Sequence, residues 1–250
     1  MKNNLLEIKN LSKIYHNKQR ELLALKDITF SVKKDEFISI IGPSGCGKST
    51  ILSILADMVN KSSGTIAFNI KNPKIGYMLQ EDCLFPWKTV LDNACLGLEI
   101  KGLLNKETKE KTIKLLKKYG LGDFINSYPN SLSGGLKQRV ALIRTLALNP
   151  NILLLDEPFS ALDYQTRLAL SDDLKRIIQN EGKTVIMVTH DIAEAISMSD
   201  KVIIITNRPG TIKKIIDIDL EEKKSPTENR KDKKFTYYYE MLWKELDHHV

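Results

Sequence analysis

The nonapeptide GPSGCGKST at residues 42–50 constrains the fold of this 250-residue chain more than any other feature. It matches the pattern G-x-x-x-x-G-K-[ST], follows the apolar run 37–41, and precedes a helix predicted from residue 48 to about residue 60. A strand, a glycine-rich loop and a helix in this order turn backbone N–H groups toward phosphate oxygens. We therefore expect a phosphate-binding loop made of Gly42, Pro43, Ser44, Gly45, Cys46, Gly47, Lys48, Ser49 and Thr50.

Two side chains of this loop have specific expected roles. The ammonium of Lys48 would neutralise the terminal phosphates of a nucleotide, and the hydroxyl of Ser49 would bind Mg²⁺. A chance match to the pattern is expected in roughly one chain per hundred of this length, and the strand–loop–helix context makes chance rarer still. The thiol of Cys46 lies inside the loop, and we expect it to be sensitive to oxidation.

A second motif, NILLLDEP at residues 151–158, is an apolar run that ends in two carboxylates. Such a run is typical of a strand buried on both faces, and open α/β sheets bind ligands at the carboxyl ends of their strands. We expect Asp156 to hold Mg²⁺ through water and Glu157 to act as the general base that positions the attacking water. The alternative is that both carboxylates only cap a helix.

Four more polar residues follow predicted strands or the carboxylate motif. Gln80 and His190 each come directly after a strand, and Ser160 and Asp163 lie in the loop that follows the two carboxylates. Because the carboxyl ends of parallel strands meet at one edge of a sheet, we expect these residues beside the phosphate-binding loop. A lone histidine is usually structural, but at this edge we expect His190 to contact the γ-phosphate.

A second glycine-rich helix start occurs in PNSLSGGLKQRV at residues 129–140. Ser133 is a suitable N-cap, and apolar residues then recur at helical spacing. Gly134 and Gly135 in the first turn are poor helix formers, but they leave backbone N–H groups bare at the positive end of a helix. This arrangement suits a phosphate, although the chain already has one phosphate-binding loop.

The order of the predicted elements indicates an α/β fold with a mainly parallel sheet. Strands and helices alternate after residue 150, which is typical of a parallel sheet with helices on its faces. Residues 89–149 are predicted to be helical, with Thr89 and Asn105 as the N-caps of the first two helices. The predicted strands are 5–11, 22–32, 37–41, 64–68, 74–79, 151–155, 183–189 and 201–206, and helices are predicted at 164–180, 191–198 and 235–246.

The composition of the chain limits which classes of partner it is expected to bind directly. No apolar run approaches the roughly 18 residues that span a bilayer, and we expect no secretory signal, so membrane contact would go through a partner. The net charge of +7 comes from scattered lysines without interleaved aromatics, which favours a solvated surface over a nucleic-acid site. The cysteines lack zinc or redox spacing, which fits a reducing cytoplasm, and Cys95 is expected in the core.

Taken together, these motifs resemble the ATP-binding subunit of ABC transporters over the first 220 residues. The stretch LSGGLKQR at 132–139 is similar to the ABC signature, with Leu136 in the place of the usual glutamine. The resemblance implies a P-loop NTPase core with a mainly parallel sheet, an antiparallel β subdomain and a helical insert at about 85–150. It also implies that Gln80 is the Q-loop glutamine and senses Mg²⁺, that SALD at 160–163 is the D-loop with Asp163, that His190 is the switch histidine, and that Tyr15 stacks on adenine.

The same resemblance implies how the second glycine-rich turn is used. In the family two subunits face each other head to tail, and each ATP lies between the phosphate-binding loop of one and the signature of the other. Ser133, Gly134 and Gly135 would therefore reach the ATP held by a second copy of the chain. ATP and Mg²⁺ are the expected cofactors, and ATP hydrolysis would separate the two copies.

The resemblance implies that membrane permease subunits are direct partners and that an extracytoplasmic solute-binding protein is an indirect partner. It also implies that the chain is located at the cytoplasmic face of the membrane. Phe85, Pro86 and Trp87 are candidates for an exposed patch that receives a permease helix; the alternative is that they belong to the core of the insert. LFPWKTVLDNACLGLE and the NRPG turn resemble the nitrate, sulfonate and taurine importer branch, which also carries thiamine-precursor pyrimidines.

Two other readings of the chain stay open at this point. One is an ABC-type ATPase in a non-transport role, although the 53 residues between Gln80 and Ser133 leave no room for a long coiled coil. The other is a small P-loop kinase or GTPase, which would lack an LSGG segment.

We expect an ATP-binding domain at 1–220, a polar linker at 221–234 and an amphipathic C-terminal helix within 235–250 that docks on its own domain or on a partner.

Overall fold

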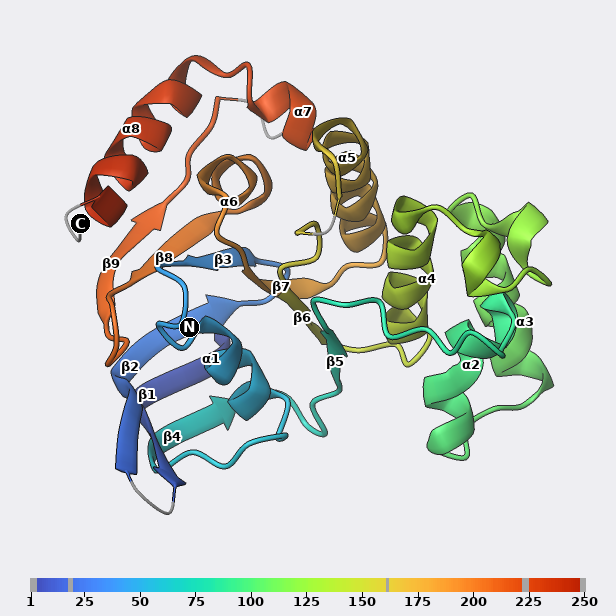
Figure 1. Ribbon diagram of the computed structural model, residues 1–250, viewed down its shortest axis with the longest axis horizontal. Coiled ribbons are helices and arrows are strands. Elements are labelled where there is room, and N and C mark those ends of the chain that lie inside the picture. Colours follow the sequence, from blue (N-terminus) through green and yellow to red (C-terminus); the bar gives the residue numbers. More distant parts are fainter. Residues whose placement is uncertain (1–3, 18–19, 161, 222–224, 248–250) are drawn as a thin grey trace.

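A six-stranded sheet forms the centre of the protein in the computed structural model, which describes residues 4–17, 20–160, 162–221 and 225–247 (Figure 1). From one edge to the other the strands are β5 (Ile75–Met78), β6 (Ile152–Asp156), β7 (Thr184–Val188), β3 (Phe37–Ile41), β8 (Lys201–Ile205) and β9 (Ile212–Asp217). The first five run parallel, and β9 is antiparallel to β8. Every residue of β3, β6 and β7 is buried, as expected for parallel strands that are covered on both faces.

A second, antiparallel sheet lies beside the first and consists of β2 (Arg20–Lys33), β1 (Asn4–Asn17) and β4 (Ser63–Phe68), in that order. Helix α1 (Lys48–Leu55) lies between the two sheets (Figure 1). One hydrophobic cluster joins all three parts, since it includes Leu6 and Ile28 of the antiparallel sheet, Ile51 of the helix and Leu154 of β6. This arrangement confirms the predicted mainly parallel sheet with an antiparallel β subdomain.

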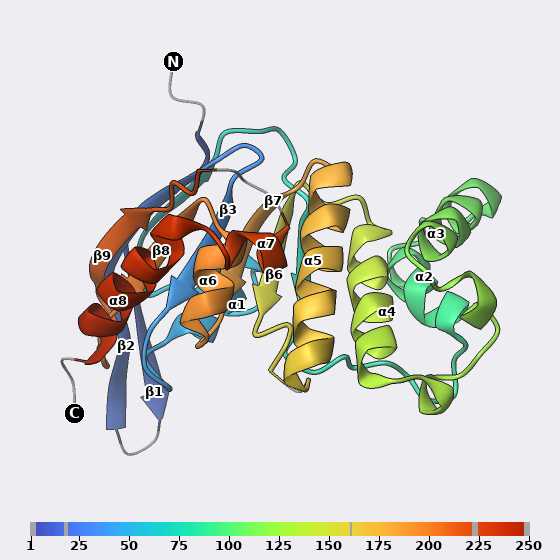
Figure 2. The same cartoon turned by 90° about the horizontal axis from the view of Figure 1, so that it is seen from above.

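A helical insert extends from the β5 edge of the molecule (Figure 2). It contains α2 (Val90–Ile100), α3 (Lys106–Lys118), 3₁₀ turns at Gly122–Phe124 and Pro129–Ser131, and α4 (Gly134–Leu146). The three α-helices begin at the predicted caps: Thr89, Asn105 and Ser133 each accept a hydrogen bond from a backbone N–H three residues later. Cys95 of α2 is buried in the core, as predicted.

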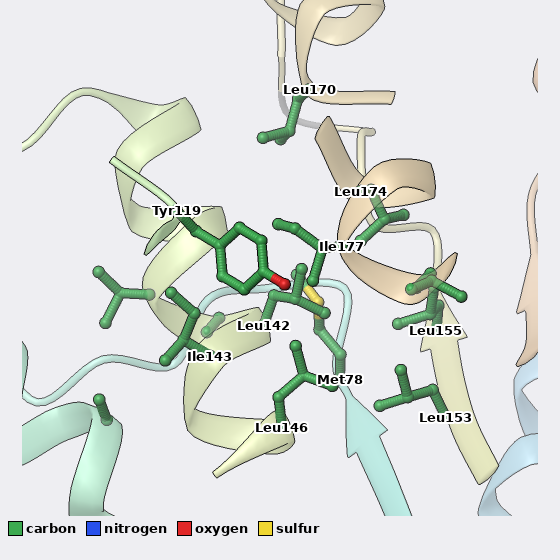
Figure 3. Close-up of a cluster of buried hydrophobic side chains, with 14 of the residues drawn as sticks. Met78, Tyr119, Leu142, Ile143, Leu146, Leu153, Leu155, Leu170, Leu174 and Ile177 are labelled. Atoms are coloured by element: carbon green, nitrogen blue, oxygen red, sulfur yellow. The ribbon is translucent and has the colours of Figure 1, made fainter. Parts of the chain in front are cut away.

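A hydrophobic cluster attaches the insert to the central sheet (Figure 3). It brings together Met78 of β5, Leu142 of α4, Leu155 of β6 and Leu174 of helix α5 (Tyr164–Asn180). These side chains are almost fully buried, so the signature helix α4 is packed firmly against the elements that carry the carboxylate motif.

The C-terminal segment packs on the outer face of the sheet near α6 (Ile192–Met198) (Figure 2). Helix α8 (Lys233–Asp247) inserts the fully buried Leu242 into a cluster with Ile196 of α6 and Ile216 of β9. The predicted C-terminal helix thus docks on its own domain. None of the described helices is both long and apolar enough to cross a membrane.

Two elements differ from the sequence expectation. Strand β9 was not predicted, because its sequence IKKIID does not alternate regularly between apolar and polar residues. The segment 221–234, expected to be a polar linker, contains the short helix α7 (Pro226–Asn229), which packs against α5 and α6. Its Asn229 is buried and donates to the carbonyl oxygen of Ser197 at 2.7 Å.

Candidate functional site

The glycine-rich loop connects β3 to α1 and bends so tightly that two of its glycines are needed sterically. Gly47 has a φ of 106°, and a Cβ atom there would lie 2.7 Å from Cδ2 of Leu25. A Cβ atom at Gly42 would lie 2.6 Å from the carbonyl oxygen of Ile205. Lys48 folds back over the loop and donates to the carbonyl oxygens of Gly42 at 2.8 Å and Pro43 at 2.9 Å. The loop's own carbonyl oxygens therefore fix the position of the ammonium group.

Ser49 connects this loop to the carboxylate motif at the end of β6. Its hydroxyl donates to Oδ1 of Asp156 at 3.0 Å, and the hydroxyl of Tyr77 donates to Oδ2 at 3.0 Å. Burial raises the pKa of Asp156, and the hydrogen bonds from Ser49 and Tyr77 oppose that shift. Burial, together with the charge of Asp156, raises the pKa of Tyr77 to about 12, so its hydroxyl stays protonated and donates. Tyr77 was not predicted as a site residue; it reaches Asp156 from the neighbouring strand β5.

The oxygens of Ser49 and Asp156 fit a magnesium ion, because Mg²⁺ prefers a few hard protein oxygens supplemented by phosphate and water. Among the described residues no group of three or more histidine, cysteine, aspartate or glutamate side chains is arranged as a metal cage. Phosphate oxygens of a nucleotide and water would supply the remaining ligands of a magnesium ion held by Ser49 and Asp156.

Glu157, His190 and Gln80 meet at the same edge of the sheet. Oε2 of Glu157 lies 3.0 Å from Nδ1 of His190 and accepts a long hydrogen bond of 3.4 Å from Nε2 of Gln80. The same Nε2 donates to the hydroxyl of Ser160 at 3.4 Å. Glu157 has a φ of 44°, which is strained for a residue with a side chain, and its N–H donates to the carbonyl oxygen of Val188 at 2.9 Å. The strained turn directs the carboxylate toward the histidine.

A cavity of about 400 Å³ opens over the phosphate-binding loop. It contains the lysine of the loop and the carboxylate proposed as the base, and its size is in the range of small-ligand sites. The lining residues are Tyr15, Leu22, Ala24, Ser44, Gly45, Gly47, Lys48, Ser49, Thr50, Gln80, Glu157 and Arg208.

Tyr15 and Arg208 lie on the rim of this cavity. Tyr15 is exposed, its ring lies 4.7 Å from the ammonium of Lys13, and its hydroxyl is 3.5 Å from that of Thr50. Arg208 donates from Nη2 to the carbonyl oxygen of Gly45 at 2.7 Å. Arg208 was not predicted as a site residue, although it belongs to the NRPG turn that directly follows β8. It adds a second cation beside the loop.

The signature turn does not line this cavity. Ser133 and Gly134 are exposed at the start of α4, and Ser133 accepts from the N–H of Leu136 at 3.4 Å. A Cβ atom at Gly134 would lie 3.2 Å from Leu162, and one at Gly135 would lie 3.1 Å from Thr166. Asp163 also lies outside the cavity and caps α5 by accepting from the N–H of Thr166 at 3.0 Å. Ala161, within the predicted D-loop, lies outside the described residues.

The structure argues against the expectation that Cys46 is sensitive to oxidation. The residue is only 1% exposed, and burial raises the pKa of its thiol even though Lys48 and Arg208 act in the opposite direction. A buried neutral thiol is a poor nucleophile, so its packing beneath the loop is its evident role.

Comparison with known proteins places this geometry in a family. Residues 25–160 match the family model described as ABC transporter, which is more than half of the chain. The chain is 45% identical to the uncharacterized ABC transporter ATP-binding protein YtlC of Bacillus subtilis, over 97% of this chain and 95% of that protein. It is 41% identical to the aliphatic sulfonates import ATP-binding protein SsuB of Bacillus cereus, over 89% of each. It is 38% identical to the nitrate import ATP-binding protein NrtD of Synechocystis, over 90% of this chain and 86% of that protein.

Solved structures give the same assignment. The dimeric structure of MJ0796, a bacterial ABC transporter cassette, superposes with a TM-score of 0.73 at 34% identity, over 86% of this chain and 99% of that chain. A post-hydrolysis state of the same cassette, bound to ADP and Pi, superposes with a TM-score of 0.72 at 35% identity over the same shares. With its phosphate-binding loop, paired carboxylates and signature helix in these positions, the chain belongs to the ABC transporter family, as an ATP-binding subunit that is an ATPase.

Proposed function

We propose that this chain is the ATP-hydrolysing motor subunit of an ABC importer and that two copies close around two ATP molecules to drive a membrane permease. One observation carries the proposal: each chain holds two phosphate-binding features that do not meet. The loop at 42–50 lines the cavity, whereas the exposed turn at Ser133 and Gly134 lies outside it. A second copy, placed head to tail, would bring each turn to the other chain's ATP.

Each residue of one ATP site has its own proposed role. Lys48 is released from the carbonyl oxygens of its own loop and pairs with the terminal phosphates, while Tyr15 stacks on the adenine and Arg208 adds charge at the rim. Ser49 and Asp156 would hold Mg²⁺, which would supply positive charge that offsets the charge of the phosphates, and Gln80 would complete this side of the site.

Glu157 is proposed as the general base, and His190 as the residue that orients it and contacts the γ-phosphate. The distance of 3.0 Å between their side chains supports this pairing, because a general base needs a group that fixes its orientation. Gln80 donates to the same carboxylate oxygen of Glu157. Loss of the γ-phosphate would therefore alter the contacts of Gln80, Glu157 and His190 together.

Dimerisation around ATP is supported by the MJ0796 cassette, whose similar chain is dimeric. In the proposed dimer the Ser133 hydroxyl and the N–H groups of Gly134 and Gly135 bind the γ-phosphate of the ATP held by the partner copy. The positive end of α4 favours that negative charge. Loss of the γ-phosphate on hydrolysis removes this contact and lets the two copies separate.

Coupling to a permease is supported by an exposed aromatic patch at the start of the insert. Phe85 and Trp87 are 37% and 69% exposed, and their rings stack with centroids 5.0 Å apart. Exposed aromatics on a loop beside the Q-loop favour the docking role over the alternative of an insert core. The subunit would then lie at the cytoplasmic face of the membrane, with an extracytoplasmic solute-binding protein as an indirect partner.

For the cargo we propose nitrate-, sulfonate- or taurine-like small solutes, or related ones that include thiamine-precursor pyrimidines. The sulfonate and nitrate import proteins among the relatives support this branch. We further propose an ATP-binding domain at 1–220 with the insert at about 85–150, followed by the segment 221–234 and the C-terminal helix.

The test of the importer role is affinity purification from native membranes in a mild detergent, with a tag on this chain and a tag-only control. Co-purification of a multi-span membrane protein is the expected result, and its solute-binding protein can then be screened for cargo. Recovery of only soluble or nucleic-acid-bound partners would overturn the transport role and leave the ATP chemistry intact.

A further inference from the structure

Arg167, in the first turns of α5, contacts two loops that belong to different parts of the proposed dimer site. Its Nη2 donates to the carbonyl oxygen of Leu162 at 3.1 Å, and its Nη1 lies 3.3 Å from Oδ2 of Asp191. Its Nε lies 3.7 Å from Oε1 of Glu194, a residue that is only 3% exposed. One guanidinium thus faces three oxygens on two segments of the chain, the loop before α5 and the start of α6.

The two carboxylates fix the turn that carries His190. Asp191 directly follows His190, and Thr189 directly precedes it. The N–H of Asp191 donates to the hydroxyl of Thr189 at 3.0 Å. The same hydroxyl donates to Oε2 of Glu194 at 2.7 Å. Arg167 is therefore connected to the histidine turn directly through Asp191 and indirectly through Glu194 and the Thr189 hydroxyl.

The third contact of Arg167 leads toward the signature turn. Leu162 packs so closely on that turn that a Cβ atom at Gly134 would lie 3.2 Å from its Cδ2 atom. Thr166, next to Arg167 in α5, approaches Gly135 in the same way, at 3.1 Å from a Cβ atom there. A movement of the signature turn would thus be transmitted to the start of α5 by direct contact.

We propose that Arg167 is a positioning residue that couples the two ATP half-sites of one chain. The coupling runs from the signature turn through Leu162 and Arg167 to the turn of His190. This inference rests on the proposed function, since the signature turn contacts the partner's ATP only in the head-to-tail dimer. Binding of the partner's ATP at Ser133 then orients the histidine that faces the chain's own ATP.

One contact in this coupling leaves room for a small rearrangement. Among the described residues, Nε of Arg167 is buried without a hydrogen-bond partner, because 3.7 Å from Glu194 is too long for a hydrogen bond. A shift of less than 1 Å of the α6 start toward α5 would form that bond. Arginine spreads its N–H donors over the three nitrogens of a rigid, planar fork, whereas the three donors of a lysine share one nitrogen, so Arg167→Lys would not reproduce all of these contacts.

The test compares Arg167→Met and Arg167→Lys with the wild-type chain. Arg176→Met is the matched control, because Arg176 lies on the same helix, is exposed and also pairs with an aspartate, Asp173 at 2.6 Å, which keeps its ion pair with Arg139 in this variant. For each protein we would measure ATP affinity, kcat, KM, the Hill coefficient of hydrolysis and the midpoint of thermal unfolding. The nucleotide affinity of single sites is expected to stay within about twofold, because Arg167 does not line the cavity.

In the wild-type chain the Hill coefficient should approach about 2, its limit for two coupled sites. For Arg167→Met we expect kcat to fall by about 10- to 100-fold and the Hill coefficient to fall to about 1, with Arg167→Lys in between. Arg176→Met should behave as the wild type. A loss of thermal stability with an unchanged Hill coefficient would mean a merely structural role and would overturn the proposal, as would a wild-type coefficient of about 1.

These failures are distinct from failure of the proposed function. If the dimer forms with ATP but Arg167→Met remains cooperative, only the coupling role of Arg167 is wrong. If Glu157→Gln remains monomeric with ATP and Mg²⁺, the head-to-tail dimer is wrong, and the coupling that rests on it falls as well.

Discussion

Nδ1 of His190 lies 3.0 Å from Oε2 of Glu157, although the two residues are 33 positions apart in the chain. The register of the sheet explains this proximity. β6 and β7 are parallel neighbours in which Asp156 pairs with Val188, so the loops that follow the two strands leave the sheet side by side. The pairing of base and histidine is therefore a direct consequence of strand order.

Replacing this histidine tests the pairing. We expect His190→Ala to lower kcat by about 100-fold, because Glu157 loses the group that orients it, while ATP affinity stays within a few-fold. Steady-state ATPase assays and nucleotide titration measure both quantities. His16→Ala is the control, since that exposed histidine lies on β1 beside Glu21. Equal kcat values for His190→Ala and the wild type would contradict the assigned role.

The exposed patch at Phe85 and Trp87 predicts a separation of coupling from hydrolysis. Trp87→Ala should change the free energy of unfolding by no more than about 0.5 kcal/mol, as is usual for surface substitutions. Basal ATPase activity should persist, whereas permease binding and transport should be lost. Tyr237→Ala, at another exposed aromatic on α8, is the control. Unchanged transport by the Trp87→Ala variant would contradict the proposed role of Phe85 and Trp87 in permease docking.

The docking of α8 predicts a large stability effect at Leu242. This side chain is fully buried among residues of α6, β8 and β9, so Leu242→Ala should lower the free energy of unfolding by about 2–5 kcal/mol. Glu240→Ala, at an exposed position of the same helix, should have little effect. Denaturant unfolding of both variants measures the difference, and equal values would show that α8 does not stabilise the domain.

Glu194 predicts a dependence of stability on pH. Burial raises its pKa from the ordinary 4.5 to about 7, an effect that Asp191 reinforces and that the Thr189 hydroxyl, Arg167 and Arg230 oppose. Between these two values the folded chain retains a proton that the unfolded chain releases, so this residue's contribution to stability falls as the pH rises through about 7. The total loss is at most about 3 kcal/mol.

Glu194→Gln removes that titration and is nearly the same size. Denaturant unfolding at about pH 5 and about pH 8 should therefore show a smaller loss of stability for the variant than for the wild type. The same loss for both proteins would mean that Glu194 has an ordinary pKa in the folded chain.

The sequence predicted the parts of the site that local patterns encode. The glycine-rich loop, the carboxylates after β6, and the N-caps of α2, α3 and α4 all depend on residues within a few positions of each other. Strand order brought Gln80, Glu157 and His190 together as expected, because parallel strands that alternate with helices share one carboxyl edge.

Contacts between distant segments were harder to predict. The hydroxyl of Tyr77 reaches Asp156 because β5 pairs with β6, a pairing of strands that a local pattern does not reveal. The contact between Arg208 and the carbonyl oxygen of Gly45 also joins segments that are distant in the sequence, since Arg208 lies in the turn after β8. Helix α7 did have a start signal, since Ser225 and Glu228 have capping-box spacing with Pro226 between them, but the surrounding charges indicated a linker.

The most direct test of the central claim is the oligomeric state of Glu157→Gln with ATP and Mg²⁺, measured by sedimentation velocity. This variant keeps the phosphate-binding loop and the signature turn but lacks the proposed base, so ATP should persist and hold two copies together. We expect a stable dimer with ATP and a monomer with ADP. A chain that binds ATP yet stays monomeric would contradict the claim that each ATP lies between two copies.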